Sequence, residues 1–400
     1  MPTTVAARAE PMDRRALHDF YELDALLAPE ERLIRDSVRE YARGELLPHV
    51  GEWWLDGTFP DDLPRRFGAL GLLGLTLPER FGGAGASATA YGLLNREIEY
   101  ADSGLRSFVS VQSSLVMYPI HAYGAEALQA AWLPRLASGE AVGCFGLTEP
   151  DAGSDPGAMR SRCRRVGDDW VLTGVKRWIT SGSRADLAVV WARDADDGTV
   201  RGFLVETDRD GFSAVDIKTK ASMRASVTSE LYLDEVSVPD ANRLAVEGMR
   251  GPLSCLNQAR FGIAWGVLGA GFACFDEAAA YVGDRPVFGV PLAAKQLVQA
   301  SLADMLAGLT KGSLLAYHLG RLKEAGKDTP ARVSLAKRDN VRTALAVARA
   351  ARDLLGGNGI TTEYGAVRHM LNLESVITYE GTDTVHTLLL GREITGHNAF

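Results

Sequence analysis

Apolar residues recur with a helical period near both ends of the chain and with a period close to two between them. Residues 27–143 follow the helical spacing, and Pro29 suits a first helical turn. A second segment, 125–133, has the same spacing and is predicted to end before Pro134, because proline removes a backbone donor and clashes with the preceding turn. We therefore expect a helical N-terminal domain over residues 27–143.

Strand-like patterns occupy the middle of the chain. A Gly167-Asp168 turn precedes an apolar run at 170–172, and residues 187–192 and 200–205 are two further β-type runs. No helix-length segment separates these runs, which argues against a parallel sheet built from β-α-β units. We expect a middle domain with an antiparallel β-sheet over residues 144–248.

Long helices return after residue 248. Thr329-Pro330 is a helix start with Thr329 as the N-cap, and Gly356-Gly357 ends the same helix. The apolar stripe of this helix consists of Val333, Ala336, Val341, Ala344, Val347, Ala351 and Leu355. The predicted fold class is α+β multidomain, with a flexible leader (1–26), a helical domain (27–143), a β domain (144–248) and a second helical domain (249–400).

Charge and composition narrow the classes of protein. The 43 basic and 51 acidic residues give a net charge of −8, which argues against a nucleic-acid or membrane partner. No apolar run reaches the ~18 residues that span a bilayer, and the most apolar stretch, 261–275, is predicted to be a buried helix. Four cysteines without a CxxC pair favour a reducing compartment over a zinc site. We expect a soluble protein of the bacterial cytoplasm.

The densest chemical signal is Tyr379-Glu380-Gly381-Thr382. Apolar helical patterns precede and follow it, and Thr382 can cap the second helix. A glutamate in a dry pocket has a raised pKa, which suits a general base near neutral pH, whereas a nearby helix N-terminus lowers that pKa. The alternative is an ordinary surface glutamate before a helix.

Four further segments suit a planar, anionic cofactor. Residues 146–155 (GLTEPDAGSD) can present backbone N–H groups to an anion, or form a plain interdomain turn. Residues 178–182 (WITSG) can cover a ring, or bury a core tryptophan. Residues 354–359 (LLGGNG) permit close approach of a ligand, or only end a helix. Arg285 can pair with a phosphate, or lie free on the surface.

These motifs in this order resemble the acyl-CoA dehydrogenase family, over essentially the whole chain from Leu27. The resemblance is carried by GLTEPDAGSD, WIT, RPVFG, LLGGNG and YEGT. Within the family the chain looks closest to the glutaryl-CoA dehydrogenases, on residues 102–107, 110–116, 144–146, 223–226 and 257–266. The resemblance implies a C-terminal four-helix bundle, FAD as cofactor, an acyl-CoA substrate, an electron-transfer flavoprotein as partner and a homotetramer.

The resemblance also implies roles for individual residues. Glu380 is expected to be the base that removes the proton beside the thioester, while a hydride passes to the flavin. Arg106, Ser107 and Ser110 are expected to hold a distal carboxylate, for which a guanidinium fork and hydroxyls are suited. An ion pair of Arg106 with Glu99 or Asp102 is the alternative. The other substrate-binding residues implied are Ser154, Arg260, Gly381, Glu99 and Tyr379.

The cofactor-binding residues implied come from two domains. The middle domain contributes Phe145, Leu147, Thr148, Gly153, Ser154, Trp178, Ile179 and Thr180. The C-terminal domain contributes Arg285, Phe288, Gln296, Asp353, Gly356, Gly357, Thr382, Thr384 and Phe400. Of these, Arg285, Phe288, Gln296 and residues 353–357 are expected to reach the FAD of a neighbouring subunit. Thr384 departs from the family pattern, which puts its flavin contact in doubt, and Trp53-Trp54 has no counterpart there.

The reaction implied is oxidation of glutaryl-CoA at its α,β-bond with decarboxylation to crotonyl-CoA and CO2, as in lysine and tryptophan degradation. Three alternatives stay open. The first is a dehydrogenase for another short or dicarboxylic acyl-CoA without decarboxylation. The second is a flavin oxidase or monooxygenase on the same fold, and the third is a non-enzymatic flavoprotein scaffold.

Overall fold

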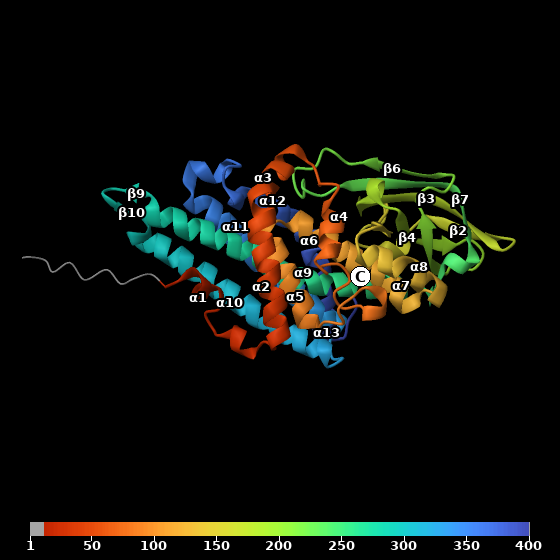
Figure 1. Ribbon diagram of the computed structural model, residues 1–400, viewed down its shortest axis with the longest axis horizontal. Coiled ribbons are helices and arrows are strands. Elements are labelled where there is room, and N and C mark those ends of the chain that lie inside the picture. The colour runs from red at the N-terminus through yellow and green to blue at the C-terminus, as the bar shows by residue number, and fades with distance from the viewer. Residues whose placement is uncertain (1–11, 400) are drawn as a thin grey trace, which may run out of the picture.

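The computed structural model describes residues 12–399, and Figure 1 shows an elongated molecule with its β-sheet at one end. Helices from the N-terminal and C-terminal thirds of the chain form the rest. The strands of the middle third therefore lie to one side of a single helical body (Figure 1). The predicted order of helices, sheet and helices is confirmed.

The N-terminal helices form where the periodicity predicts them, with two corrections. The helices are α1 (Arg14–His18), α2 (Pro29–Tyr41), α3 (Leu47–Asp56), α4 (Leu63–Ala69), α5 (Ala88–Ala101), α6 (Ser103–Ser110), α7 (Tyr118–Tyr123) and α8 (Glu126–Ala137). Helix α8 runs through Pro134 instead of ending before it. Leu133 and Leu136 are fully buried on either side of the proline, and this packing offsets its lost hydrogen bond.

The second correction concerns the expected leader. Its first residues, 1–11, lie outside the described part of the chain, but α1 and a 3₁₀ turn (Leu23–Leu26) already belong to the fold. His18 Nε2 lies 2.9 Å from Asp276 Oδ1. This contact joins the expected leader to the C-terminal domain, so residues 14–26 are folded rather than flexible.

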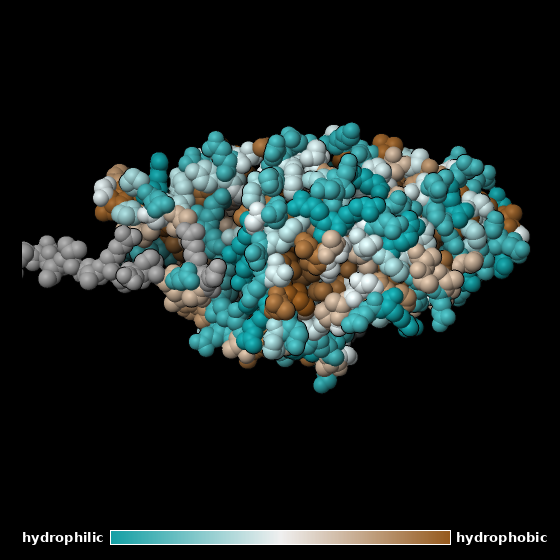
Figure 2. Space-filling view, viewed as in Figure 1, coloured by the Kyte–Doolittle hydropathy of each residue, from teal (hydrophilic) through white to brown (hydrophobic). Residues whose placement is uncertain are grey.

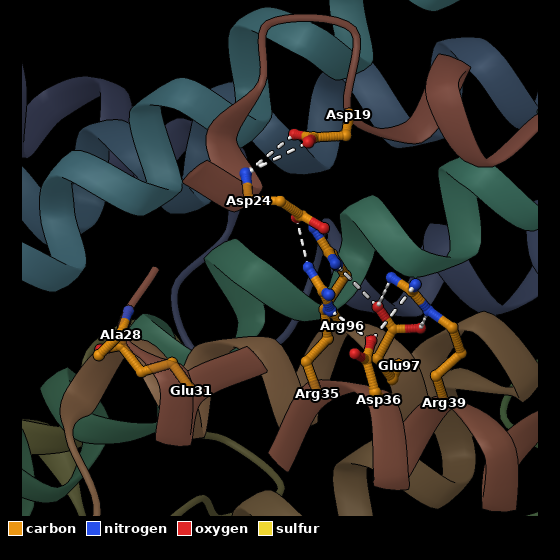
Figure 3. A network of polar contacts seen from close by, with 9 residues as sticks. All are labelled: Asp19, Asp24, Ala28, Glu31, Arg35, Asp36, Arg39, Arg96 and Glu97. Carbon is orange, nitrogen blue, oxygen red and sulfur yellow. Dashed lines mark hydrogen bonds and ion pairs between the residues drawn. The ribbon is translucent and has the colours of Figure 1, made fainter. Parts of the chain in front are cut away.

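A network of charged side chains fastens α2 to α5 (Figure 3). Glu97 on α5 is buried between two arginines, accepting from Arg39 Nε at 3.1 Å and from Arg96 Nη2 at 2.8 Å. Arg35 on α2 pairs with Asp24. Because the buried carboxylate has a cation on each side, its charge is compensated within the fold.

The middle domain is an eight-stranded sheet in the order β6-β7-β3-β2-β4-β5-β8, with β1 also paired to β4. The strands are β1 (Gly143–Gly146), β2 (Arg162–Val166), β3 (Asp169–Thr180), β4 (Leu187–Asp194), β5 (Val200–Glu206), β6 (Phe212–Asp216), β7 (Thr228–Pro239) and β8 (Arg243–Glu247). The sheet is mixed rather than wholly antiparallel, because β1 and β2 both run parallel to β4. The predicted turn at Gly167-Asp168 joins the antiparallel pair β2 and β3.

The C-terminal domain is a helical bundle around one buried helix. Its elements are α9 (Arg250–Asp284), β9 (Pro286–Val287), β10 (Val290–Pro291), α10 (Gln296–Glu324), α11 (Pro330–Leu354), α12 (Gly365–Val376) and α13 (Asp383–Thr395). By length and hydropathy alone, α9 reaches the limits for crossing a membrane, but 78% of its most apolar stretch is buried. The predicted buried segment 261–275 lies within this core helix.

Helix α11 begins and ends as its sequence predicts. The Thr329 side chain accepts a hydrogen bond from Arg332 N, which caps the first turn, and Pro330 follows. The predicted stripe from Val333 to Leu355 is buried. This stripe packs α11 against α9 and brings Lys337 into the interior of the molecule.

Candidate active site

Glu380 lies on the short connection between α12 and α13, as predicted. Thr382 caps α13, since its Oγ1 accepts from Val385 N at 3.1 Å. Glu380 and Gly381 have φ angles of 51° and 90°, so two successive residues are left-handed. A Cβ on Gly381 would lie 2.8 Å from His386 Nε2, so only glycine fits there. The sharp turn exists because the sequence places Gly381 directly after the glutamate.

Arg106 reaches this connection from the N-terminal domain. Its Nε donates to Glu99 Oε2 at 2.6 Å, and its Nη2 donates to the Tyr379 hydroxyl. Arg106 and Glu99 are both fully shielded from solvent. Helix α9 passes so close that a Cβ on Gly266 would lie 2.2 Å from Glu99 Oε2. The structure thus brings together three predicted site residues from sequence positions far apart.

Four polar atoms of the predicted site are buried without a hydrogen-bond partner in the part of the chain that the structure describes. They are Glu99 Oε1, Arg106 Nη1, Ser110 Oγ and Glu380 Oε2. Buried polar groups are nearly always paired in folded proteins, so such a group calls for an explanation. A polar ligand between α5, α6 and the 377–382 connection would supply the missing partners. We call these four residues, together with Tyr379, the base cluster.

Two basic side chains approach the same connection from the C-terminal domain. Arg260 Nε donates to the Glu380 carbonyl at 2.7 Å. Lys337 Nζ donates to the Tyr379 carbonyl at 2.9 Å and to the Gly381 carbonyl at 2.7 Å. The glutamate therefore has three cations nearby, counting Arg106.

Burial dominates the electrostatics of the base cluster. It raises the pKa of the Glu380 carboxyl above its usual value, and Arg106, Lys337 and Arg260 only partly oppose that shift. Burial likewise raises the pKa of Glu99, against the opposing charge of Arg106. Burial lowers the pKa of the Lys337 ammonium to about 7, although Glu380 acts in the opposite direction. A carboxylate with a raised pKa can accept a proton near neutral pH.

A second group of site residues lies where β1 leads into the 146–155 loop. The Thr148 carbonyl accepts from Arg177 N at 2.8 Å, which holds the loop beside β3. Lys176 Nζ lies 2.8 Å from Glu149 Oε1 and also donates to the Leu147 carbonyl at 3.2 Å. Glu149 in turn accepts from the Arg160 and Ser161 amides. One buried ion pair therefore sets the path of this loop.

Trp178 is the exposed member of this group. Its side chain is 54% exposed at the end of β3, and its φ of 63° is left-handed. Phe145, Leu147 and Ile179 are buried, whereas Thr148 and Thr180 are partly open and Gly153 and Ser154 are exposed. An exposed indole beside hydroxyls and an open glycine loop fits a flavin, because it offers a flat apolar surface and polar groups for the ring edge and phosphates.

The remaining predicted residues do not join either group. Arg285, Phe288 and Gln296 are exposed around β9 and β10, at the end of the molecule opposite the sheet (Figure 1). Hydrophobic side chains show at this tip in Figure 2, and Phe288 is 93% exposed. Asp353, Gly356, Gly357 and Thr384 are also exposed, and Phe400 lies outside the described residues.

Two lysines of the site were not predicted from the sequence. Lys337 lies four residues after Val333 and four before Val341, so it falls on the buried stripe of α11. A lysine at such a position is a signal that the sequence does carry. Lys176 lies on β3 between residues of mixed burial, and no pattern marks it. Trp54, which had no counterpart in the family motifs, is structural, since its Nε1 donates to Asn372 Oδ1 at 2.9 Å.

Comparison with known proteins places the whole chain in one family. The N-terminal, middle and C-terminal domain profiles of acyl-CoA dehydrogenases match residues 28–140, 144–236 and 247–395. The chain is 33% identical to the mitochondrial short-chain specific acyl-CoA dehydrogenase of Homo sapiens, over 98% of each chain.

Solved structures agree with this assignment. Glutaryl-CoA dehydrogenase from Mycobacterium smegmatis is 53% identical, with a TM-score of 0.94 over 96% of this chain and 99% of that one. A second structure of a glutaryl-CoA dehydrogenase from the same organism, in complex with FADH2, is 51% identical over the same shares, with a TM-score of 0.94. The chain therefore belongs to the acyl-CoA dehydrogenase family, and it is an FAD enzyme that acts on acyl-CoA thioesters.

Proposed function

We propose that the protein oxidises glutaryl-CoA at the α,β-bond and decarboxylates the product to crotonyl-CoA and CO2. The observation that carries this proposal is the fully buried Arg106. Its Nη1 has no partner among the described residues, and it lies in the same cluster as Glu380 Oε2, which also lacks one there. A substrate with a thioester at one end and a carboxylate at the other would engage both groups. The 53% identity to a glutaryl-CoA dehydrogenase supports the same substrate.

Glu380 is the proposed base. Its carboxylate would take the proton from the carbon next to the thioester, and its raised pKa makes it basic enough to do so. No described residue accepts a hydrogen bond from the Glu380 backbone N–H. That N–H is free to donate to the thioester oxygen and stabilise the negative charge that develops there.

Arg106 is the proposed anchor for the distal carboxylate, with Ser107 and Ser110 beside it on the same helix. Glu99 already pairs with Arg106, so an added carboxylate would place two acids on one guanidinium. The raised pKa of Glu99 eases this conflict, because a proton on Glu99 leaves the Arg106 charge available. Tyr379 would keep the guanidinium oriented through its hydroxyl.

The 146–155 loop and the end of β3 are the proposed flavin site, with Thr148, Trp178 and Thr180 as its main contacts. Bound FAD supplies a two-electron acceptor for the hydride that leaves the β-carbon. The buried Lys176–Glu149 pair would hold the loop in place for the cofactor. Arg260 would orient the Glu380 carbonyl and lie near the CoA portion of the substrate.

Decarboxylation follows from the chemistry of the oxidised thioester. Once the α,β-double bond has formed, the carbon–carbon bond to the distal carboxylate can break, with its electron pair delocalised into the thioester. CO2 leaves, and the carbanion takes a proton at the γ-carbon to give crotonyl-CoA. The protonated Glu380 is the proposed source of that proton, so the base returns to its starting state.

We propose an electron-transfer flavoprotein as the electron acceptor and a homotetramer as the assembly. Large apolar side chains stand exposed on the C-terminal domain, among them Phe288 (93%), Leu297 (85%) and Ile394 (83%). Contacts between copies would bury them. Arg285, Phe288 and Gln296 would then reach the flavin of a neighbouring subunit, which they do not approach in their own chain.

A second candidate is a dehydrogenase for a short monocarboxylic acyl-CoA. The Arg106–Glu99 pair favours it, because a neutralised arginine needs no carboxylate partner. The test is anaerobic titration of the purified yellow protein with glutaryl-CoA and with butyryl-CoA, together with analysis of CO2. Loss of flavin absorbance and release of CO2 with glutaryl-CoA support the proposal. Reduction by butyryl-CoA alone supports the second candidate.

A further inference from the structure

The carbonyl groups of Tyr379, Glu380 and Gly381 all accept hydrogen bonds from buried cations. Lys337 Nζ on α11 binds the first and third carbonyls at 2.9 and 2.7 Å, and Arg260 Nε on α9 binds the middle one at 2.7 Å. Three consecutive carbonyls thus accept hydrogen bonds from helices of the C-terminal bundle. The geometry leaves the Glu380 N–H without a partner among the described residues.

This loop needs such support because its backbone is strained. Glu380 is a non-glycine residue with a φ of 51°, a conformation that costs roughly 1–2 kcal/mol for an L-residue. The connection also makes ordinary turn bonds, from Tyr379 N to the Ser375 carbonyl and from Asp383 N to the Ile377 carbonyl. Those bonds lie at the two ends of the connection. Among the described residues, only Lys337 and Arg260 donate hydrogen bonds to the carbonyls of Tyr379, Glu380 and Gly381.

A buried lysine such as Lys337 is an unfavourable residue for a purely structural contact. Its side chain is 1% exposed, and its Nζ contacts two carbonyls with no described carboxylate within ion-pair distance. Burying an ammonium without an ion pair is costly, and a leucine or methionine would fill the same stripe of α11 without that cost. The charged groups that face Lys337 are Glu380, Arg260, Arg106 and Asp383.

The nearby histidine does not duplicate this role. His386 on α13 is fully buried against Gly381, and neither of its ring nitrogens has a hydrogen-bond partner within residues 12–399. Burial, with Lys337 and Arg260 nearby, lowers the pKa of His386 to about 3, so the ring is neutral. Lys337 is therefore the cation of α11 that donates to the carbonyls on both sides of Glu380.

We propose that Lys337 is a positioning residue for proton abstraction: by binding the carbonyls on both sides of Glu380, it aims the carboxylate and the backbone N–H at the substrate. The inference rests on the proposed role of Glu380 as the base. Lys337 does not touch the reacting atoms. Its loss would leave the turn free to relax, and a displacement of about 1 Å at a catalytic group can cost ~100-fold in rate.

The test compares Lys337→Met with Lys220→Met, the same substitution at a half-buried lysine. Lys220 Nζ also donates to two carbonyls, those of Met223 and Ser226, but it lies outside the base cluster. Each holoenzyme is mixed anaerobically with saturating butyryl-CoA and, separately, glutaryl-CoA. The rate of flavin bleaching, the half-saturating concentration and the isotope effect of α-deuterated butyryl-CoA are measured at equal FAD content.

The flavin of Lys337→Met should bleach about 100-fold more slowly than that of the wild type. The half-saturating concentration of the thioester should change little, and the isotope effect of α-deuterated butyryl-CoA on the bleaching rate should be larger. Lys220→Met should keep the wild-type rate and isotope effect. Lys337→Arg retains a cation with several donors and should recover part of the rate, and it replaces Lys337→Met if that variant does not fold. A wild-type rate in the Lys337 variants, or an equal loss in Lys220→Met, would overturn the proposal.

Glu380→Gln, measured in the same way, distinguishes the proposed role of Glu380 as the base from the proposed role of Lys337 as a positioning residue. If Glu380→Gln bleaches normally, the proposed base is wrong and the positioning role fails with it. If Glu380→Gln is inactive while Lys337→Met is normal, the base stands and only the role of Lys337 is wrong.

Discussion

Arg106 Nε donates to Glu99 Oε2 at 2.6 Å, and neither side chain is accessible to solvent. A buried pair of this kind adds little stability over apolar residues of the same size. A role in ligand binding is the better explanation of the pair, since Arg106 Nη1 and Glu99 Oε1 both lack partners within the described structure. We propose that the pair is pre-arranged to meet a polar group of the substrate.

Replacing Arg106 tests that interpretation. In Arg106→Ala, the kcat/KM for glutaryl-CoA should fall about 10- to 100-fold relative to that for butyryl-CoA, because hydrogen bonds to charged groups contribute roughly 1.5–3 kcal/mol. Steady-state kinetics with both thioesters give the ratio. Glu99→Gln is the matched control, which keeps the shape of the pocket and should retain the preference for glutaryl-CoA. An unchanged ratio in Arg106→Ala would exclude the dicarboxylate assignment.

The raised pKa of Glu380 predicts how activity depends on pH. The deprotonated carboxylate is the active form, so kcat/KM should fall as the pH drops through the pKa of Glu380. Because burial raises that pKa above the usual 4.5, the loss should begin at a higher pH than for an exposed glutamate. A profile of kcat/KM against pH, over the range where FAD stays bound, measures the position of this limb. Activity that persists unchanged down to pH 4.5 would contradict a buried base.

The sequence predicts those parts of this site that depend on local pattern. The caps at Thr329 and Thr382, the buried stripe of α11 and the turn at Gly381 all follow from neighbouring residues. The approach of Arg106 to Tyr379 cannot be read from spacing, because 273 positions separate the two residues. The resemblance to a family supplied those roles, and the alternative of an Arg106–Glu99 ion pair proved to be present as well.

Other features depend on tertiary packing that local rules do not contain. Proline usually ends a helix, yet Pro134 stays inside α8 because Leu133 and Leu136 are buried around it. The parallel pairing of β1 with β4 is also invisible in sequence, because β1 is only four residues long. The apolar stripe of α11 does not predict a role for Lys337, because apolar positions alone define that stripe.

Breaking the Lys176–Glu149 pair should weaken the binding of FAD rather than slow the chemical step. Lys176→Met would leave Glu149 buried beside the 146–155 loop without its cation, and breaking a buried pair costs roughly 3–5 kcal/mol. The variant should therefore bind FAD at least tenfold more weakly, measured as flavin fluorescence released on dilution. Lys220→Met serves again as the control and should keep its FAD. Equal retention of FAD in both variants would show that the pair does not set the loop.

The lowered pKa of Glu97 predicts that the folded state loses stability in acid. Burial opposes ionisation, but Arg96 and Arg39 outweigh it and hold the pKa of Glu97 at about 2, against 4.5 for the free side chain. The stabilisation is present above pH 4.5 and is lost as the pH falls toward 2. Between these values the unfolding free energy of the wild type should drop faster than that of Glu97→Gln, in urea titrations. Parallel curves would indicate that the network in Figure 3 contributes no pH-dependent stability.

The proposed chemistry depends on the Glu380 carboxylate, which would remove the proton beside the thioester. Anaerobic mixing of glutaryl-CoA with wild type and with Glu380→Gln, each carrying FAD, tests it most directly, with loss of the visible flavin absorbance as the readout. The wild type should bleach at once, whereas Glu380→Gln should bleach roughly 10²–10⁴-fold more slowly while still binding the thioester. Bleaching of Glu380→Gln at the wild-type rate would contradict the account.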